Sequence, residues 1–461
     1  MNDAVIKVAE IVRNAGGRAL LVGGCVRDEL LKGDPKDFDL ECFGIAAERL
    51  QAELGKYFRL DLVGASFGVL KLHGYDIDVA LPRRETKLGL GHRAFEMEYD
   101  PFLSIREASA RRDFTINAIY RDPLSGEVID PWNGREDLEK RILRHVSEHF
   151  VEDPLRVLRG MQFAARFELT AAPETIAICR TMTSENLAQE RLFEEWAKLL
   201  TRGVKISRGL EFLRATGWVK YYPELERLIG CGQDPHWHPE GDVWNHTLCC
   251  LDAFAPYADL IVGFAVLCHD FGKPFCTRYD PVKKRIRSLG HDEAGVKPTE
   301  DFLKRLTNEE RILKEVPPLV RYHMRPFAMW KDQSSDSAIR RLATKVGRMD
   351  RLIAVARADD AGRPPYPREP EPLDWLARET KRLEVEAAAP KPILMGRDLI
   401  ALGLTPSPLF GKLLAECYEA QLDGVITDHP SAMEYLKNIR CTSVTIRSKA
   451  RDRSPDSSPE P

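Results

Sequence analysis

Hydrophobic and polar positions follow two different periods along the chain, and each period predicts a different part of the fold. In residues 1–145, the apolar run 19–22 and the segment 67–82 predict strands, the latter as a pair around a turn at Gly74. Residues 1–17 have the pattern of an amphipathic helix. We further expect a helix to begin within 113–122, and a strand followed by a turn at 126–134. Long parallel strand–helix–strand repeats are absent, which favours a small mixed sheet.

From residue 146 onward, apolar residues recur at steps of three and four, as in 153–167 and 185–200, and this spacing predicts helices. The chain is therefore predicted to be an α+β protein. Proline-rich composition predicts a linker late in the chain, and the polar C-terminal end predicts disorder. The predicted parts are a head (1–145), a helical neck (146–230), a second helical domain (231–363), a linker (364–392), a helical C-terminal unit (393–440) and a disordered tail (441–461).

Composition limits the partners and the compartment. The chain has 461 residues and a formal net charge of −3, so a nucleic acid would have to be held by local basic patches. The ten cysteines include no CxxC pair, and Cys249 and Cys250 are adjacent, which favours reduced structural thiols in a cytoplasmic protein. The apolar run 260–268 is too short to cross a bilayer, and we expect no membrane partner.

Two glycines and two aspartates near the N-terminus point to phosphate chemistry. Gly23 and Gly24 follow a predicted strand and precede Arg27, so backbone amides and a guanidinium could bind phosphate there. An isolated glycine pair is more often a plain turn. However, Asp37 and Asp39 are two residues apart and would share one face of a strand, where two carboxylates need a cation such as Mg²⁺ or Mn²⁺. Asp78, preferred to Asp76, would supply a third carboxylate from a neighbouring strand.

Four segments, 20–41, 110–122, 151–167 and 189–200, resemble successive signature motifs of the class II tRNA nucleotidyltransferases. This family contains the CCA-adding enzymes and their poly(A) polymerase relatives. The resemblance implies a polymerase-β-like nucleotidyltransferase head followed by a helical neck, body and tail, with tRNA, CTP and ATP as substrates. It implies that Asp37, Asp39 and Asp78 are catalytic and that Mg²⁺ binds Asp37 and Asp39. The nucleotide-binding residues would be Gly23, Gly24, Arg27, Arg112, Asp113, Asn117, Asp153, Arg156 and Arg159.

In this family the segment around Asp153 and Arg156 selects the nucleotide. The two residues are three apart on a predicted helix and would lie on one face. A carboxylate accepts a hydrogen bond from the amino group of cytosine or adenine, and an arginine donates to an acceptor on the same base edge. Asp153 before Pro154 is also a common helix cap, and both roles can coexist. Gln162 stands where many family members have a further arginine.

Histidines cluster in residues 231–363. His246, the adjacent His269 and Asp270, and Asp359 resemble the metal ligands of HD phosphohydrolases, with Ni²⁺, Mn²⁺ or Mg²⁺ as candidate metals. His291 and His323 are candidate additional ligands or phosphate contacts, whereas His236 and His238 are expected to be structural or surface residues. Some bacterial CCA-adding enzymes carry such a domain, with 2′,3′-cyclic phosphodiesterase, 2′-nucleotidase and phosphatase activities.

Three functions are compatible with the sequence. The first is CCA addition to tRNA with an accessory HD phosphohydrolase. The second keeps the chemistry but changes the product, as in an A-adding enzyme or a poly(A) polymerase. The third is an HD phosphohydrolase whose head only binds RNA, although the complete set of head aspartates and arginines argues against it. CTP incorporation separates the first two, and the sequence leaves the oligomeric state open.

Overall fold

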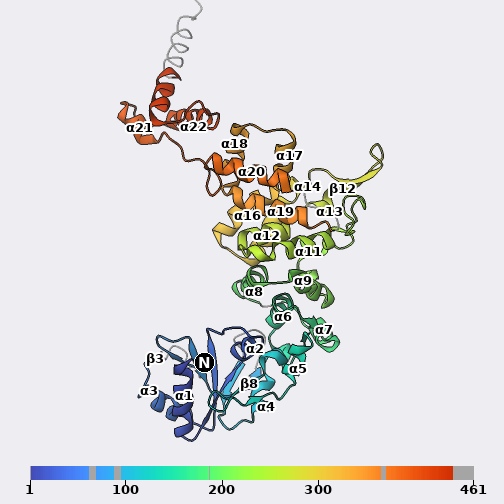
Figure 1. The fold of residues 1–461 in the computed structure, drawn as a ribbon, viewed down its shortest axis with the longest axis vertical. Coiled ribbons are helices and arrows are strands. Elements are labelled where there is room, and N and C mark those ends of the chain that lie inside the picture. The colour runs from blue at the N-terminus through green and yellow to red at the C-terminus, as the bar shows by residue number, and fades with distance from the viewer. Residues whose placement is uncertain (1, 62–68, 88–94, 186, 365–369, 440–461) are drawn as a thin grey trace, which may run out of the picture. The chain divides into compact units, whose positions relative to one another are not determined.

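The computed structural model describes residues 2–61, 69–87, 95–185, 187–364 and 370–439 (Figure 1). Its internal contacts divide the chain into a first unit, residues 1–263 with 300–309, and a second unit, residues 264–299 with 310–461. No helix in the described ranges is long and apolar enough to cross a membrane. The predicted domain boundaries at 145, 230 and 363 stay predictions, and the predicted disordered tail lies outside the described residues.

The head is built on a mixed seven-stranded sheet of order β3-β4-β5-β2-β1-β8-β9. β2 and β5 are parallel, and the other neighbours are antiparallel. This confirms the expected small mixed sheet. The strands are β1 (Arg18–Val22), β2 (Phe38–Phe43), β3 (Leu60–Asp61), β4 (Val69–Leu72), β5 (Ile77–Ala80), β8 (Tyr120–Arg121) and β9 (Val128–Ile129), with β6 (Arg83–Lys87) and β7 (Phe95–Tyr99) forming a separate hairpin.

One face of the head sheet is apolar and the other carries the polar candidates. Leu40 and Cys42 of β2 and Val79 of β5 are buried in one core with residues of α1 (Asp3–Asn14) and α3 (Ala47–Gly55). Side chains alternate along a strand, so the residues between them point to the opposite face. The alternation therefore places Asp39 and Asp78 on the face away from that core.

The rest of the first unit consists of helices, 3₁₀ turns and one short pair of strands. Gly209 lets α9 (Ile206–Ala215) approach α6 (Leu155–Arg166), since a Cβ there would lie 2.6 Å from the carbonyl oxygen of Met161. A short parallel pair, β10 (Ile142–Leu143) with β11 (Thr170–Ala171), was not expected from the sequence. The helices are α2 (Gly24–Leu30), α4 (Ile105–Ala110), α5 (Gly134–Glu139), α6 (Leu155–Arg166), α7 (Pro173–Arg180), α8 (Gln189–Arg202), α9 (Ile206–Ala215), α10 (Pro223–Glu226) and α11 (Val243–Phe254), with 3₁₀ turns η2 (Thr115–Asn117), η3 (Glu148–Glu152), η4 (Trp218–Tyr221) and η5 (Ala255–Tyr257).

The helix expected to begin within 113–122 does not form. Only the 3₁₀ turn η2 is present, and the chain then enters β8, where Tyr120 pairs with Val22 of β1. The N–H and C=O groups of β8 form their hydrogen bonds with β1 instead of within a helix. The stabilisation from this pairing outweighs the helical preference of the local sequence.

The second unit is mainly helical. Two helices, α12 (Leu260–Cys268) and α15 (Val296–Leu306), run across the boundaries between the units. The other helices are α13 (Lys273–Cys276), α14 (His291–Ala294), α16 (Glu310–Tyr322), α17 (Arg325–Lys331), α18 (Asp336–Val346), α19 (Met349–Ala361), α20 (Pro370–Arg382), α21 (Gly396–Ala401) and α22 (Pro408–Leu422).

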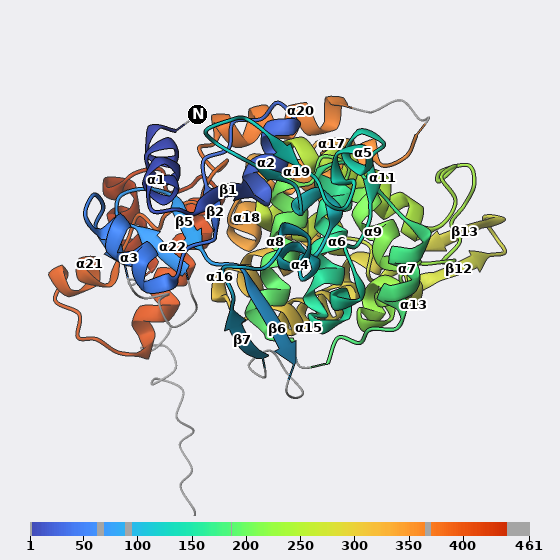
Figure 2. The same cartoon turned by 90° about the horizontal axis from the view of Figure 1, so that it is seen from below.

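A β-hairpin interrupts the helices of the predicted 231–363 domain, which corrects the expectation that this domain is wholly helical. β12 (Thr277–Asp280) pairs with β13 (Arg285–Ser288), and Figure 2 shows the hairpin extending away from its neighbours. Asp280 fixes the turn, because its carboxylate accepts hydrogen bonds from the amides of Val282 and Lys283. Many residues of this hairpin are charged, so alternation of apolar residues gave no strand signal.

The predicted linker 364–392 contains a helix and is wrong in that part. α20 buries Leu373 and Leu376, and Arg357 of α19 donates to Asp374 at 2.5 Å. Pro370 and Pro372 lie in its first turn, where backbone N–H groups have no hydrogen-bond partner within the helix. Proline, which lacks the N–H, is therefore tolerated there. Proline content alone therefore gave a misleading prediction of a linker.

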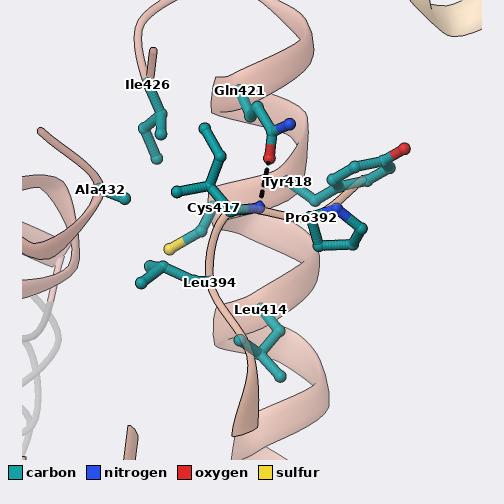
Figure 3. Close-up of a pocket in the computed structure, with 9 residues that line it drawn as sticks. Pro392, Leu394, Leu414, Cys417, Tyr418, Gln421, Ile426 and Ala432 are labelled. Atoms are coloured by element: carbon teal, nitrogen blue, oxygen red, sulfur yellow. Dashed lines mark hydrogen bonds between the residues drawn. The ribbon is translucent and has the colours of Figure 1, made fainter. Parts of the chain in front are cut away.

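The predicted C-terminal helical unit has a small core of its own. Leu394, Leu399 and Cys417 are buried together, along with Ala432 and Leu436 from the helical residues 429–439. Figure 3 shows the side chains around Cys417, including Gln421, whose Oε1 accepts a hydrogen bond from the Ile393 amide at 3.0 Å. These contacts hold the segment before α21 against α22.

Candidate functional site

Asp39 and Asp78 lie side by side on the face of the head sheet away from the apolar core, and Asp37 lies just before β2. Asp39 of β2 lies directly opposite Asp78 of β5 in the parallel register, and Asp37 precedes Asp39 by two residues. Removal from water raises the pKa of Asp39, the charges of Asp78 and Asp37 raise it further, and Arg112 opposes them. Oxygen donors crowded in this way suit a hard divalent cation.

The three carboxylates are close but not gathered onto one point. Within the described ranges, the sets whose ligand atoms all lie within 4.8 Å of one another do not include Asp37, Asp39 and Asp78. Lys71, the cross-strand neighbour of Asp78, places its Nζ 3.1 Å from the Asp78 carboxylate. Mutual repulsion and this ion pair both favour separated carboxylates.

The glycine turn lies beside this acidic face. Gly23 has φ +84°, a conformation that favours glycine, and a Cβ there would lie 3.4 Å from Arg112 Nη1 and 3.6 Å from Asp39 Oδ2. Gly24 begins α2, and its Cβ would lie 3.5 Å from Arg27 Nη2. The turn therefore brings backbone amides close to both the acidic face and two arginines.

Glu41 continues the alternation of Asp37 and Asp39, and the sequence analysis did not assign it. It is buried, and it accepts hydrogen bonds from the Tyr120 hydroxyl at 2.6 Å and from Arg111 at 2.9 Å. Burial acts to raise the pKa of Glu41, but Arg112 and Arg111 lower it below its ordinary value. Glu41 therefore holds two arginines at the edge of the acidic face, and the period-two pattern of 37, 39 and 41 was the available signal.

Hydrogen bonds and one ion pair join Arg27, beside the glycine turn, to α6. Arg27 is buried and donates from Nη1 to Asn117 Oδ1 at 2.5 Å, while Asn117 Nδ2 donates to Asp113 Oδ1 at 2.9 Å. Asp113 Oδ2 lies 2.9 Å from Arg159 Nη2. Arg27 also pairs with Asp28. The structure therefore brings together four of the predicted nucleotide-binding residues, and it commits Arg27 to protein partners.

Replacing Asp113 by asparagine is expected to destabilise the head by about 2 kcal/mol at pH 7, because the ion pair with Arg159 is lost and the acceptor of the Asn117 hydrogen bond loses its charge. Burial acts to raise the pKa of Asp113, but Arg159 and Asn117 lower it. A carboxyl with a lowered folded pKa stabilises above its unfolded pKa of about 3.9 and loses that effect as the pH falls. The deficit of the variant should therefore shrink below about pH 4.

The measurement is urea unfolding between pH 7 and pH 3, with hydrogen exchange in head peptides as the probe of unfolding. Asp34→Asn, at an exposed position of the same domain, is the matched control and should show no deficit. A deficit for Asp113→Asn that stays constant from pH 7 to pH 3 would contradict the proposed ion pair.

Asp153 and Arg156 do not share one helix face, which corrects the prediction. Asp153 has extended backbone before α6, and Pro154 is the cap residue, although the Asp153 carboxylate still accepts from the Leu155 amide at 3.1 Å. The same carboxylate accepts from Arg191 of α8 at 2.8 Å. Arg156 instead donates to the backbone carbonyl oxygens of His149, at 2.5 Å, and Arg111, at 2.7 Å.

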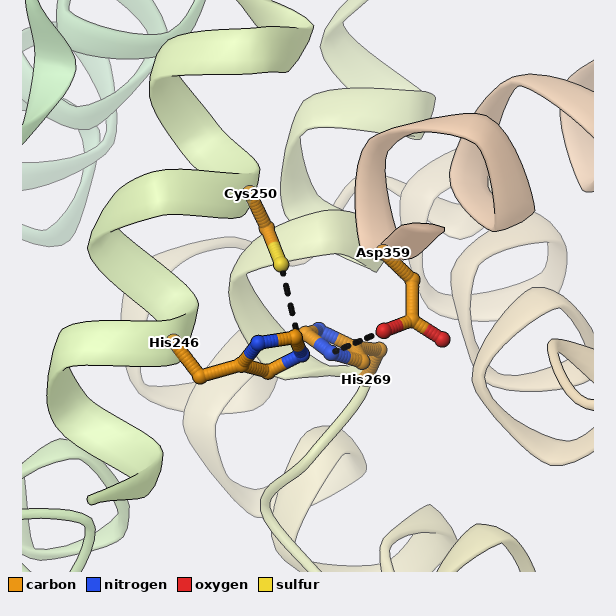
Figure 4. A group of neighbouring side chains, drawn as sticks. All are labelled: His246, Cys250, His269 and Asp359. Atoms are coloured by element: carbon orange, nitrogen blue, oxygen red, sulfur yellow. Dashed lines mark hydrogen bonds and ion pairs between the residues drawn. The ribbon is translucent and has the colours of Figure 1, made fainter. Parts of the chain in front are cut away.

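Histidines and carboxylates gather within the second unit. His269 Nε2 lies 3.2 Å from Asp270 Oδ2 and 3.9 Å from Asp359 Oδ1, the latter pair being drawn in Figure 4. The ligand atoms of Asp270, His291 and His323 all lie within 4.8 Å of one another. Neighbouring charges, foremost His269 and Lys273, hold the pKa of Asp270 well below its ordinary value although burial opposes them. Five of the six residues predicted for this site therefore lie together in the second unit.

Hydrogen bonds fix the same ring orientation for all three histidines. The Nδ1–H groups of His269, His291 and His323 donate to the carbonyl oxygens of Val266, Ser288 and Val320, each at 2.7 Å. A carbonyl oxygen can only accept, so each Nε2 presents a lone pair when the ring is neutral. His291 Nε2 and His323 Nε2 are 3.2 Å apart. Two lone pairs at this distance favour a shared cation, so the donor set fits a metal.

His246, the remaining predicted ligand, lies on α11 in the first unit. Its Nδ1 is 2.8 Å from Glu240 Oε1, which also accepts from His238 at 2.9 Å. Although burial acts to raise it, the pKa of Glu240 is lowered to about 2 by these two histidines. Glu240 therefore links these two histidines.

Comparison with known proteins decides the family. Residues 19–144 match the poly A polymerase head domain. The multifunctional CCA protein of Xanthomonas oryzae pv. oryzae is 34% identical over 420 residues, which span 86% of this chain and 96% of the relative. That of Chromobacterium violaceum is 35% identical over 416 residues, spanning 87% and 98%.

The chain belongs to the CCA-adding enzyme and poly(A) polymerase family. It is therefore a nucleotidyltransferase. The fold agrees, because the Bacillus stearothermophilus CCA-adding enzyme in complex with CTP superposes with a TM-score of 0.67 at 23% identity, over 96% of this chain and 98% of that one. The Thermotoga maritima CCA-adding enzyme complexed with tRNA gives a TM-score of 0.56 at 19% identity, over 95% and 94%.

Two positions, Gln162 and Arg191, add to the assignments made from the family motifs. Gln162 on α6 is buried, and its Oε1 accepts no hydrogen bond from the described residues. Arg191 was missed by the sequence analysis, although it lies in a segment that resembles a family motif. Membership of that motif was the available signal for Arg191. Its contact with Asp153 is seen only in the fold, where α8 brings the two residues together.

Proposed function

We propose that the protein adds CCA to the 3′ ends of tRNA from CTP and ATP, without a nucleic-acid template. The observation that carries this proposal is the pairing of Asp39 with Asp78 on one sheet face, beside the Gly23 turn. Relatives called multifunctional CCA proteins that align over nearly their whole length support it. In this reaction the tRNA 3′-hydroxyl attacks the α-phosphorus of CTP or ATP and pyrophosphate leaves.

The chain's own residues would bind and orient the reactants. Asp37 and Asp39 would hold Mg²⁺ with Asp78 as the third carboxylate, because Asp39 and Asp78 offer oxygen donors on one face and the charge of Asp37 acts on Asp39. A divalent cation there supplies charge stabilisation and lowers the pKa of a bound hydroxyl. The amides of Gly23 and Gly24 would face the triphosphate. Arg112 would add a fixed positive charge beside the triphosphate, because its Nη2 lies 3.6 Å from Glu41 Oε2 in an ion pair.

Nucleotide choice would depend on Asp153 and Arg156. Because Arg191 binds one Asp153 oxygen and the Leu155 amide binds the other, the carboxylate has a fixed orientation before any base arrives. A base amino group would approach the remaining lone pairs of this carboxylate. Arg191 is therefore proposed as a positioning residue for the base-selecting carboxylate.

The test is incorporation of each of the four ribonucleoside triphosphates into a tRNA that ends before CCA. The unmodified protein should accept CTP and ATP and reject GTP and UTP. Asp153→Asn, whose amide can donate to a carbonyl oxygen, should lower CTP and ATP incorporation about 10- to 100-fold and weaken the rejection of UTP and GTP.

Glu148→Gln, an exposed change on the preceding 3₁₀ turn, is the matched control and should leave nucleotide choice unaltered. Equal incorporation of all four nucleotides by the unmodified protein would contradict the proposal. Unchanged selectivity in Asp153→Asn would remove Asp153 from it.

We further propose that the histidine cluster binds a divalent metal and hydrolyses phosphate esters such as 2′,3′-cyclic phosphates. The observation that favours this second activity is the set of histidine Nε2 atoms that face Asp270 and one another. His269, Asp270 and Asp359 would hold the metal, with His246 assigned from the sequence and His291 and His323 as additional ligands or phosphate contacts. Mixed imidazole and carboxylate donors suit Ni²⁺ or Mn²⁺ as well as Mg²⁺.

A further inference from the structure

Cys250 lies one helical turn after His246 on α11. Both side chains are buried, and their positions four residues apart place them on the same face of the helix. Figure 4 shows the Cys250 thiol pointing at the His246 ring, with Sγ 3.4 Å from Nε2. The adjacent Cys249 is only half-buried. The two neighbouring cysteines therefore have different surroundings, which their sequence alone did not indicate.

Glu240 determines which nitrogen of His246 can bind a metal. The carboxylate can only accept, so the Nδ1–H of His246 donates to it at 2.8 Å. The lone pair of the neutral ring is then on Nε2, the nitrogen nearest to Cys250. A carboxylate behind a ligating histidine is the usual arrangement that fixes the ring and raises its basicity.

The distance between the two candidate ligand atoms fits coordination of one ion. Metal bonds of about 2.0–2.1 Å to nitrogen and 2.3 Å to sulfur that meet at a tetrahedral angle place the two atoms about 3.5 Å apart. The observed separation of 3.4 Å matches this value.

We propose that Cys250 is a metal ligand, binding as the thiolate to the same ion as His246 Nε2. The inference rests on the proposed phosphohydrolase site and adds a sulfur donor to it. Sulfur is a soft ligand, so the site would prefer Zn²⁺, Co²⁺ or Ni²⁺ to Mg²⁺. Binding would release the thiol proton to solvent. The competing interpretation is that a neutral thiol donates a hydrogen bond to Nε2 and no sulfur–metal bond forms.

Titration of the full-length, metal-stripped protein with Co²⁺ separates these two interpretations, because a cobalt–thiolate bond gives a charge-transfer band in the near ultraviolet. The band should appear in the unmodified protein and in Cys249→Ser, the matched control. It should be absent in Cys250→Ser, which should still bind Co²⁺, at least about tenfold more weakly. Circular dichroism would verify that each variant is folded.

Bound Co²⁺ with no charge-transfer band in the unmodified protein would overturn the assignment of Cys250 and leave the phosphohydrolase site standing. A band that persists in Cys250→Ser would do the same. Failure of the unmodified protein to bind Co²⁺, Ni²⁺ or Mn²⁺ at all would overturn the metal site itself, a result that is visible before any variant is made.

Discussion

Asp39→Asn is expected to reduce nucleotide transfer to tRNA by about a thousandfold, because a metal bound at this face would contribute several kcal/mol of charge stabilisation. Asparagine keeps the size of the side chain and removes its charge. The partner of Asp39 in the register, Asp78, already pairs with Lys71, so the variant would leave little net negative charge at this pair of positions. The measurement is single-turnover incorporation of labelled CTP with Mg²⁺.

Asp34→Asn provides the control, since Asp34 is exposed and lies three residues before the acidic pair. It should transfer at the unmodified rate. The stability of Asp39→Asn towards unfolding should be unchanged or slightly higher, because burial and repulsion from Asp78 and Asp37 both raise the pKa of Asp39, and removing the charge relieves both. Transfer within tenfold of the unmodified rate would show that Asp39 does not hold a catalytic metal.

Asp359→Asn is expected to lower metal-dependent hydrolysis of a 2′,3′-cyclic phosphate by about a thousandfold and to leave nucleotide transfer unchanged. Asp359 on α19 faces His269 Nε2 at 3.9 Å, and replacing one of its oxygens with an amide removes the charge that a metal ligand needs. Both activities should be measured on the same protein preparation, with Ni²⁺, Mn²⁺ and Mg²⁺ compared for the hydrolysis.

The control for this variant is Asp374→Asn, which removes a half-exposed carboxylate from α20 in the same unit. It should retain both activities. Equal hydrolysis by Asp359→Asn and the unmodified protein would show that the histidine cluster is not the hydrolytic site. Loss of both hydrolysis and transfer would show that the effect of the substitution is not confined to the histidine cluster, which would contradict the prediction.

Part of the head could be predicted from the sequence because the segments that form β2 and β5 alternate between polar and apolar residues. Alternation along β2 and β5 placed Asp39 and Asp78 on one face, and the register confirms that they are neighbours. The prediction for Asp153 and Arg156 was wrong because it assumed helical backbone at Asp153. The extended backbone there and the pairing with Arg191 depend on how α8 packs near α6, which local spacing does not encode.

Elsewhere the misleading signal was composition. The hairpin β12–β13 is rich in charge and gave no apolar alternation, and the prolines before α20 resembled a linker although they occupy a helix's first turn. The histidines were recognised as a cluster, but their ring orientations come from contacts with the carbonyl oxygens of Val266, Ser288 and Val320. Only the folded backbone places such carbonyls.

The central claim is that the head adds CCA to tRNA, and the most direct test resolves the products at single-nucleotide length. A tRNA that ends before CCA is incubated with CTP, with ATP and with both, in the presence of Mg²⁺. The account predicts two additions with CTP alone and three, ending in A, with both nucleotides. A long ladder of A, addition of A only to a tRNA that already ends in CC, or no extension at all would contradict it.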